Sequence, residues 1–212
     1  MAGKRFYNDG CGVAQALDLV GERWALLVAR ELLFAPRRFS DLKSDLPGIA
    51  TNILSQRLND LAEAGILAHC DMDDGKPTKG YQLTDWGREL APVFKVTGRW
   101  MARSPRGLAE QAMSATAVIL SLASHFRPQR AKGLTLRVAC VLSGREFTLV
   151  VANRQLEVSG GRPISADLIL SGDQNALLWM LLDDEPDPAV TIDGDPIIFD
   201  QFAACFQRFQ TG

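Results

Sequence analysis

The chain has 212 residues, of which 47% are hydrophobic and 23% charged, and its formal net charge at pH 7 is −2. This composition excludes a disordered or fibrous chain, and the length suffices for two small domains that each bury a core. No run approaches the roughly 20 apolar residues of a membrane helix. The first residues lack the apolar run of a signal peptide, so we expect a cytoplasmic protein without a membrane partner.

Charge is unevenly distributed along the chain. Residues 1–107 carry 15 basic and 13 acidic side chains, net +2, whereas residues 108–212 carry 8 and 12, net −4. A nucleic-acid-binding half beside an acidic half fits this asymmetry, because phosphate binding needs only a locally basic face.

Two helices are expected first, over residues 13–20 and 22–34, separated at Gly21. Apolar residues cover much of the circumference of the second helix, as in a central helix buried between neighbours. Pro36 cannot continue it. A short helix is expected over 39–46, ended by Pro47 and Gly48.

After this tight turn the spacing predicts an amphipathic helix over 51–64, ended by Gly65. Two strands, 66–70 and 79–83, flank a turn-rich loop, and a helix capped by Thr84 runs to Met101 with an apolar stripe ending in Trp100. Helix, short helix, tight turn, amphipathic helix and β-hairpin make a winged helix-turn-helix, whose third helix enters the DNA major groove.

A linker is expected at 104–107, which divides the chain into domains 1–103 and 108–212. The sequence of the second domain predicts a helix over 111–126, five strands, and two further helices that begin at Asp173 and Pro196. The strands are expected at 134–142, 146–151, 155–159, 167–170 and 190–192. We therefore predict an α+β protein: a winged helix-turn-helix followed by a small domain with a five-stranded sheet covered by helices.

The first domain resembles the HxlR-type winged-helix regulators over about residues 8–102. The residues that carry the likeness are Cys11–Asp18, Val20–Trp24, Arg30–Leu42, Pro47–Ile49, Leu54–Leu58 and Tyr81–Gly87. The resemblance implies a homodimer that binds double-stranded DNA and controls transcription, in response to a small molecule or to oxidation. Two departures are Ala50, where the family has a capping Ser, and Thr51-Asn52, which lack the family's basic residue.

Base-edge contacts are expected from polar side chains of the third helix, since Gln and Asn pair well with adenine. They are Thr51, Asn52, Ser55, Gln56, Arg57 and Asn59. Phosphate contacts are expected before and after it, from Arg37, Arg38, Ser40, Lys43, Lys76 and Lys79. Asp71, Asp73 and Asp74 on the hairpin would repel phosphate if they faced it. We therefore expect weaker phosphate contacts from Lys76 and Lys79 than from Arg37 and Arg38. The apolar stripe of the helix 84–101 and the N-terminal segment are interpreted as the dimer surface.

The second domain looks like the small sterol-carrier-protein-like fold, on Asp167–Leu177 and Ile192–Asp195 followed by an aromatic helix. That likeness implies a cavity for apolar, lipid-like ligands. Side chains that would line it are Trp179, Met180, Phe199, Phe202 and Phe206. At helical spacing the same residues are also typical of an ordinary core.

The four cysteines, Cys11, Cys70, Cys140 and Cys205, lie far apart, so neither a zinc site nor a disulfide framework is expected. Cys11 occupies the position of a family cysteine that senses oxidants in some members, and backbone N–H groups at a helix start lower a thiol pKa. We expect either a redox role or a small residue in the dimer surface. With no metal cluster, cofactor loop or catalytic triad, the sequence does not predict an enzyme.

The sequence thus favours a regulator that binds a near-palindromic operator as a homodimer, modulated by an apolar ligand in the second domain or by thiol oxidation. One alternative is a lipid-binding or carrier protein whose winged helix serves protein association. In another, the second domain only extends the dimer.

Overall fold

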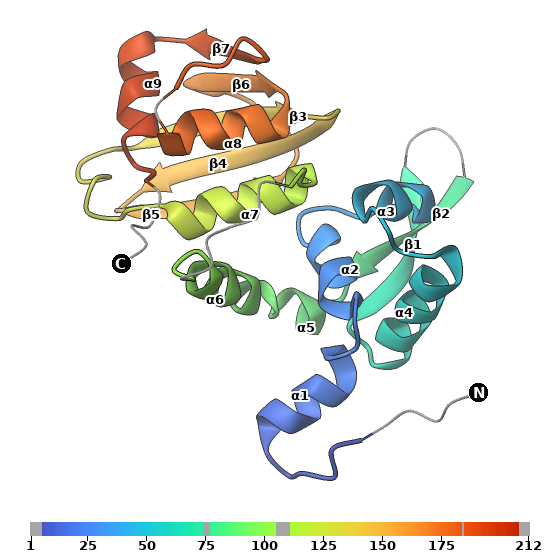
Figure 1. Ribbon diagram of the computed structural model, residues 1–212. Coiled ribbons are helices and arrows are strands. Elements are labelled where there is room, and N and C mark those ends of the chain that lie inside the picture. Colours follow the sequence, from blue (N-terminus) through green and yellow to red (C-terminus); the bar gives the residue numbers. More distant parts are fainter. Residues whose placement is uncertain (1–5, 74–76, 105–110, 184, 208–212) are drawn as a thin grey trace. The chain divides into compact units, whose positions relative to one another are not determined.

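In the computed structural model, residues 6–73, 77–104, 111–183 and 185–207 are described. The chain divides into two compact units, Met1–Ala91 and Pro92–Gly212. Figure 1 traces the elements of each. Within the described residues, no helix is long and apolar enough to cross a membrane.

The first unit is a small helical domain with a two-stranded wing. Its helices are α1 (Gly12–Val20), α2 (Ala25–Glu31), α3 (Phe39–Asp45), α4 (Thr51–Glu63) and α5 (Asp85–Arg88), and its strands are β1 (Leu67–Asp73) and β2 (Pro77–Leu83). The antiparallel strands pair Leu67 with Leu83 at the base of the wing. The Arg37 N–H and C=O both bond Tyr81, so the segment before α3 is fastened to the wing.

The core of this unit is built from one face of each helix. Leu54, Leu58 and Leu61 of α4 are buried, as their spacing predicts, and so are Val28 of α2 and Leu42 of α3. Gly48, with φ +87°, makes the tight turn into α4.

The second unit is a five-stranded mixed sheet with helices packed against it (Figure 1). Its strand order is β5-β4-β3-β6-β7, with β3 and β6 parallel and the other pairs antiparallel. The strands are β3 (Leu136–Leu142), β4 (Arg145–Ala152), β5 (Gln155–Gly160), β6 (Leu168–Gly172) and β7 (Val190–Gly194). The helices are α6 (Ala91–Met101), α7 (Ala115–His125), α8 (Gln174–Asp183) and α9 (Pro196–Ala203). The predicted fold class, a winged helix-turn-helix with an α+β part, is confirmed.

Three local predictions are wrong. The helix expected over 84–101 is two helices, because Pro92 has no N–H to bond the carbonyl four residues earlier. The second helix begins at Ala25 and not at Glu22, since Trp24 adopts a left-handed φ of 80°. The last helix ends at Ala203, which leaves Phe206 beyond it, paired as a β-bridge with Phe126.

Small residues allow α6 to lie close to α7. A Cβ at Gly98 would stand 2.7 Å from the Ser124 Oγ, closer than side chains tolerate. Ser124 is buried, and its hydroxyl donates to the Leu120 carbonyl within α7. Gly98 therefore fits α6 to the second unit at this contact.

Candidate DNA interface and second-unit pocket

Helix α4 presents an exposed polar face directly after the tight turn. Thr51, Asn52, Ser55, Gln56 and Asn59 are all exposed, whereas the opposite face is buried in the core. The Ser55 hydroxyl donates 3.1 Å back to the Thr51 carbonyl, so its lone pairs remain available as acceptors. This face offers amide and hydroxyl groups of the kind that read base edges.

Arg57 is placed differently from the other α4 residues of the expected interface. Its side chain is only 10% exposed, and its Nη1 lies 2.7 Å from an Asp60 carboxylate oxygen, with Glu22 at 4.0 Å. The structure thus puts this guanidinium in an intramolecular ion pair and not on the polar face, which the predicted role in DNA contact did not foresee.

Two of the expected phosphate contacts are also paired with acids. Arg37 is half-buried and lies 3.2 Å from Asp45 and 3.9 Å from Asp41. On the wing, Lys79 lies 2.7 Å from Asp71, and the hydrogen bond to that carboxylate raises the lysine pKa. These cations are partly neutralised within the chain.

The remaining expected contacts are grouped around α3. Ser40 is exposed at its start, Arg38 is half-buried, and the Lys43 ammonium donates to the Ile49 carbonyl in the turn before α4. Lys76 lies outside the described residues. The structure therefore brings Arg37, Arg38, Ser40 and Lys43 together beside α4, but with few unneutralised charges.

Cys11 is exposed at the N-cap of α1. Hydrogen bonds from the Val13 and Ala14 backbone N–H groups lower the pKa of its thiol. Burial has the opposite effect on Cys140, raising its pKa to about 12. Of the four thiols, Cys11 is the one that combines exposure with a lowered pKa.

The residues expected to line an apolar cavity are divided between core and surface. Phe202 and Phe206 are buried and pack edge-to-face with ring centroids 5.0 Å apart, and Met180 is 7% exposed. Trp179 and Phe199 are half-buried. A cavity of about 520 Å³ lies beside them at the ends of α8 and α9, lined by Phe206, Leu181, Leu182, Ala203 and the polar Arg130, Asp183 and Asp200. It has a more polar wall than the predicted site.

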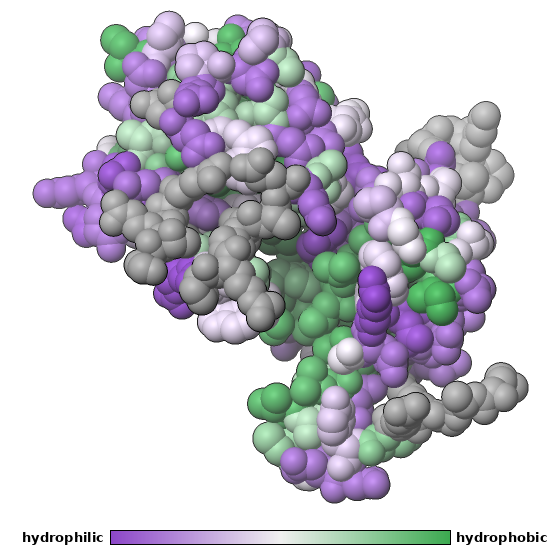
Figure 2. Space-filling model, in the orientation of Figure 1, coloured by the Kyte–Doolittle hydropathy of each residue, from purple (hydrophilic) through white to green (hydrophobic). Residues whose placement is uncertain are grey.

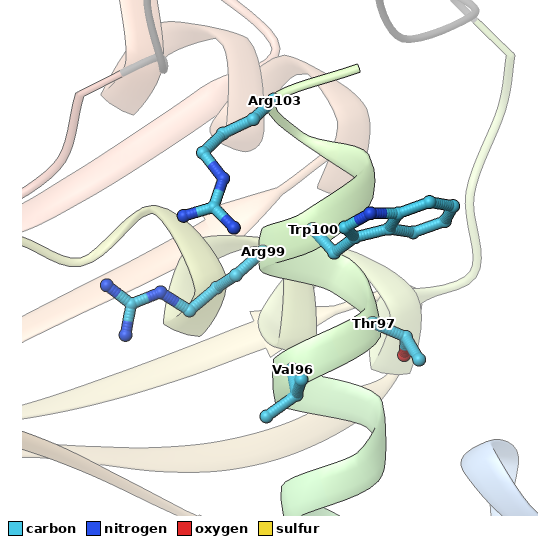
Figure 3. Close-up of a pocket in the computed structure, with 5 residues that line it drawn as sticks. All are labelled: Val96, Thr97, Arg99, Trp100 and Arg103. Carbon is cyan, nitrogen blue, oxygen red and sulfur yellow. The ribbon is translucent and has the colours of Figure 1, made fainter.

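Two helices expose apolar stripes. On α1, Val13 is 69% and Leu17 42% exposed, and Figure 2 shows hydrophobic atoms over this helix. On α6, Val96 and Trp100 are 65% and 69% exposed, and with Thr97, Arg99 and Arg103 they border a hollow of about 380 Å³ (Figure 3). The N-terminal Phe6 and Tyr7 are exposed as well.

Residues 19–106 match the model of the HxlR-like helix-turn-helix family. The regulator YvaP of Bacillus subtilis is 31% identical over 86 residues, which cover 41% of this chain and 80% of YvaP. The chain belongs to the HxlR-like helix-turn-helix family. The α3–α4 pair has the order of its helix-turn-helix.

Other transcriptional regulators are similar over part of the chain. An HTH-type transcriptional regulator of Mycobacterium tuberculosis is 40% identical over 92 residues, or 43% of this chain, and the chain spans 58% of its length. The crystal structure of reduced YodB, a transcriptional regulator from B. subtilis, is 28% identical with a TM-score of 0.40, covering 44% of this chain and 92% of that one. The relatives are named as transcriptional regulators and not as enzymes.

Proposed function

We propose that this protein is a transcriptional regulator that binds a near-palindromic DNA operator as a homodimer, with α4 in the major groove. The observation that carries the proposal is the exposed row of amides and hydroxyls on α4, immediately after the tight turn that follows α3. Asn52, Gln56 and Asn59 read bases, with adenine the preferred partner. The proposal is one of binding, without a catalytic step.

Phosphate contacts position the helix. We assign them to Arg38, Ser40 and Lys43 beside α4, with weaker contributions from Arg37 and Lys79, whose charges are shared with Asp45 and Asp71. Arg57 stabilises α4 and does not contact DNA, because its guanidinium is held in the ion pair with Asp60.

We further propose that residues 1–103 carry DNA binding and dimerisation and that residues 108–212, joined through 104–107, are a sensor; α6 belongs to the first stretch of sequence but packs with the second unit. The exposed stripes of α1 and α6 support a dimer, since apolar surface of this size in a stable protein is normally covered. In a twofold dimer the two α4 helices then lie about 34 Å apart and read successive turns of DNA.

Two inputs are proposed to modulate DNA binding. One is a small, partly apolar ligand in the cavity beside Phe206, in keeping with the likeness to sterol-carrier-like domains. The other is oxidation of Cys11, supported by its exposure and lowered pKa. Either input regulates only insofar as it binds, or reacts with, the DNA-competent and incompetent states differently.

The experiment is affinity for the protein's own upstream intergenic DNA, measured against a scrambled duplex over a salt series. Specific binding as a dimer is expected, and Gln56→Ala should remove about 1–3 kcal/mol of it while leaving scrambled-DNA affinity unchanged. Gln155→Ala, an exposed glutamine on β5, is the matched control. Equal affinity for both duplexes, unaltered by Gln56→Ala, would contradict the proposal and favour a winged helix that serves protein association.

A further inference from the structure

A second basic surface lies on the unit that follows the winged helix. Between Lys95 and Arg137 the chain has eight basic residues and one acidic residue, Glu110, a net +7 in a protein whose overall charge is −2. The basic residues are Lys95, Arg99, Arg103, Arg106, Arg127, Arg130, Lys132 and Arg137. Arg106 and Glu110 lie outside the described residues.

Two of these cations on α6, and a third in the turn directly after it, form a basic ridge. Lys95 and Arg99 are about one helical turn, or 6 Å, apart along α6, and Arg103 follows in the turn after Met101. Figure 3 shows the Arg99 and Arg103 guanidinium groups leaving α6 on the same side, away from Trp100. Arg99 and Arg103 thus border the same hollow as Val96 and Trp100 of the apolar stripe, and their guanidinium groups extend from it on one side.

The loop after α7 extends this ridge within the same unit. Gly98 of α6 meets Ser124 near the end of α7, so this loop begins beside α6. Burial, and then the positive charges of Arg99 and Arg130, lower the pKa of Arg127. Arg127 and Arg130 donate to the Gln207 and Ala204 carbonyls, which anchor this loop to the chain beyond α9.

Most of the cations on this surface are not neutralised. Among the described residues, Lys95, Arg99, Arg103, Arg130 and Lys132 form no ion pair, whereas Arg37, Arg57 and Lys79 of the first unit all do. Asp183 and Asp200 share a cavity wall with Arg130 and weaken the potential there, so Arg103 and Lys132, both exposed, are the cleaner probes.

We propose that this surface, defined by Lys95, Arg99, Arg103, Arg130 and Lys132, binds the phosphate backbone of double-stranded DNA without reading sequence. The inference rests on the proposed function, which brings DNA to this protein. Release of counterions from phosphates supplies much of the affinity of DNA-binding proteins, and the first unit alone offers few free cations for it. Guanidinium groups, which fit phosphate oxygens bidentately, make up most of the surface.

The test compares two double variants that each remove two positive charges. Arg103→Gln/Lys132→Gln alters the surface, and Arg154→Gln/Arg162→Gln alters exposed arginines elsewhere on the same unit. Affinities for upstream and scrambled duplexes are measured from about 50 to 200 mM salt, with the dimer content of each variant checked by sedimentation.

The surface variant should bind both duplexes at least tenfold more weakly at about 50 mM salt, and its log-affinity against log-salt slope should be shallower by about 2. The ratio between the duplexes should not change, and the control should behave as wild type. Equal slopes for the two variants would overturn the inference. The inference would also be overturned if the protein bound millimolar inorganic phosphate in a way that depends on Arg103 while the DNA slopes of the two variants stayed equal. That result indicates a small-anion site.

Failure of the proposed function gives a different pattern. If wild type does not distinguish the upstream duplex from the scrambled one, sequence-specific regulation is contradicted, yet the slope difference between the variants still decides whether the basic surface holds DNA.

Discussion

The Arg57 guanidinium lies 2.7 Å from the Asp60 carboxylate, three residues further along α4. Both groups are largely shielded, so the pair is a structural feature of a helix whose other polar residues face solvent. Under the proposed function, DNA reading and helix stabilisation are divided between the neighbouring residues Gln56 and Arg57.

Arg57→Leu should lower the free energy of unfolding without removing a direct contact to DNA. The variant leaves Asp60 half-buried without its partner, at a cost of about 1–2 kcal/mol in the free energy of unfolding. Urea denaturation of Arg57→Leu and Gln56→Ala measures this, with no loss expected for Gln56→Ala because its side chain is exposed. Equal stability of both would contradict a structural role for Arg57.

Asp71→Asn should strengthen DNA binding by the wing. The exposed carboxylate holds Lys79 at 2.7 Å, and its removal frees the ammonium and ends a repulsion of phosphate. We expect roughly three- to tenfold tighter binding at low salt, with stability nearly unchanged since exposed pairs contribute about 0–1 kcal/mol. Asp187→Asn, which removes the same charge elsewhere, is the control; a similar gain there would indicate only an effect of net charge.

Alkylation by iodoacetamide should single out Cys11. Because its pKa is lowered, the thiolate forms at lower pH than in an ordinary cysteine, so the rate should rise with pH and level off earlier. Cys11→Ser should remove the fast phase. Buried Cys140, with a pKa of about 12, should stay unmodified in the folded protein. A fast phase that survives in Cys11→Ser would assign the reactive thiol elsewhere.

Trp100→Asp should dissociate the dimer. The substitution places a charge on the exposed apolar stripe of α6, where desolvating it in an interface would cost several kcal/mol. Sedimentation velocity should show a monomer, whereas Ile164→Asp, at an exposed isoleucine outside the helices, should leave the assembly intact. A dimeric Trp100→Asp protein would exclude this stripe from the interface.

The effect of Gly98→Ala on the free energy of unfolding should change sign when Ser124 is replaced. In wild type the new methyl would meet the Ser124 Oγ at 2.7 Å, and we expect a loss of about 1–2 kcal/mol. In a Ser124→Ala background the hydroxyl is gone, and the better helix propensity of alanine should stabilise by about 0.5–1 kcal/mol. A double-mutant cycle in urea measures the coupling. Additive effects would mean that α6 and α7 do not touch at this point.

Local sequence patterns were sufficient to predict the α3–α4 helix pair. The Pro47-Gly48 turn and the spacing of Leu54, Leu58 and Leu61 leave little choice of structure. They were insufficient for Arg57, which lies at the edge of the apolar face, where the carboxylate at Asp60 decides its direction. The pairing of Arg37 with Asp45 likewise depends on tertiary geometry that residue types do not reveal.

In the second unit the strand predicted over 146–151 is present as β4, and its Phe147, Leu149 and Val151 are buried because one face of the sheet is covered. The aromatic residues near the C-terminus were harder to place. Phe202 and Phe206 share a helical spacing, but the helix ends between them, and Phe126, far away in sequence, completes the cluster. Such a contact depends on the packing of α7, which no local pattern contains.

The family match runs through α6, whereas the contacts of that helix assign it to the second unit. A chimera joined at the family boundary would therefore transplant a helix without the Ser124 surface to which Gly98 is fitted. Exchange of the second unit, by recombination or in the laboratory, therefore requires α6 to travel with it.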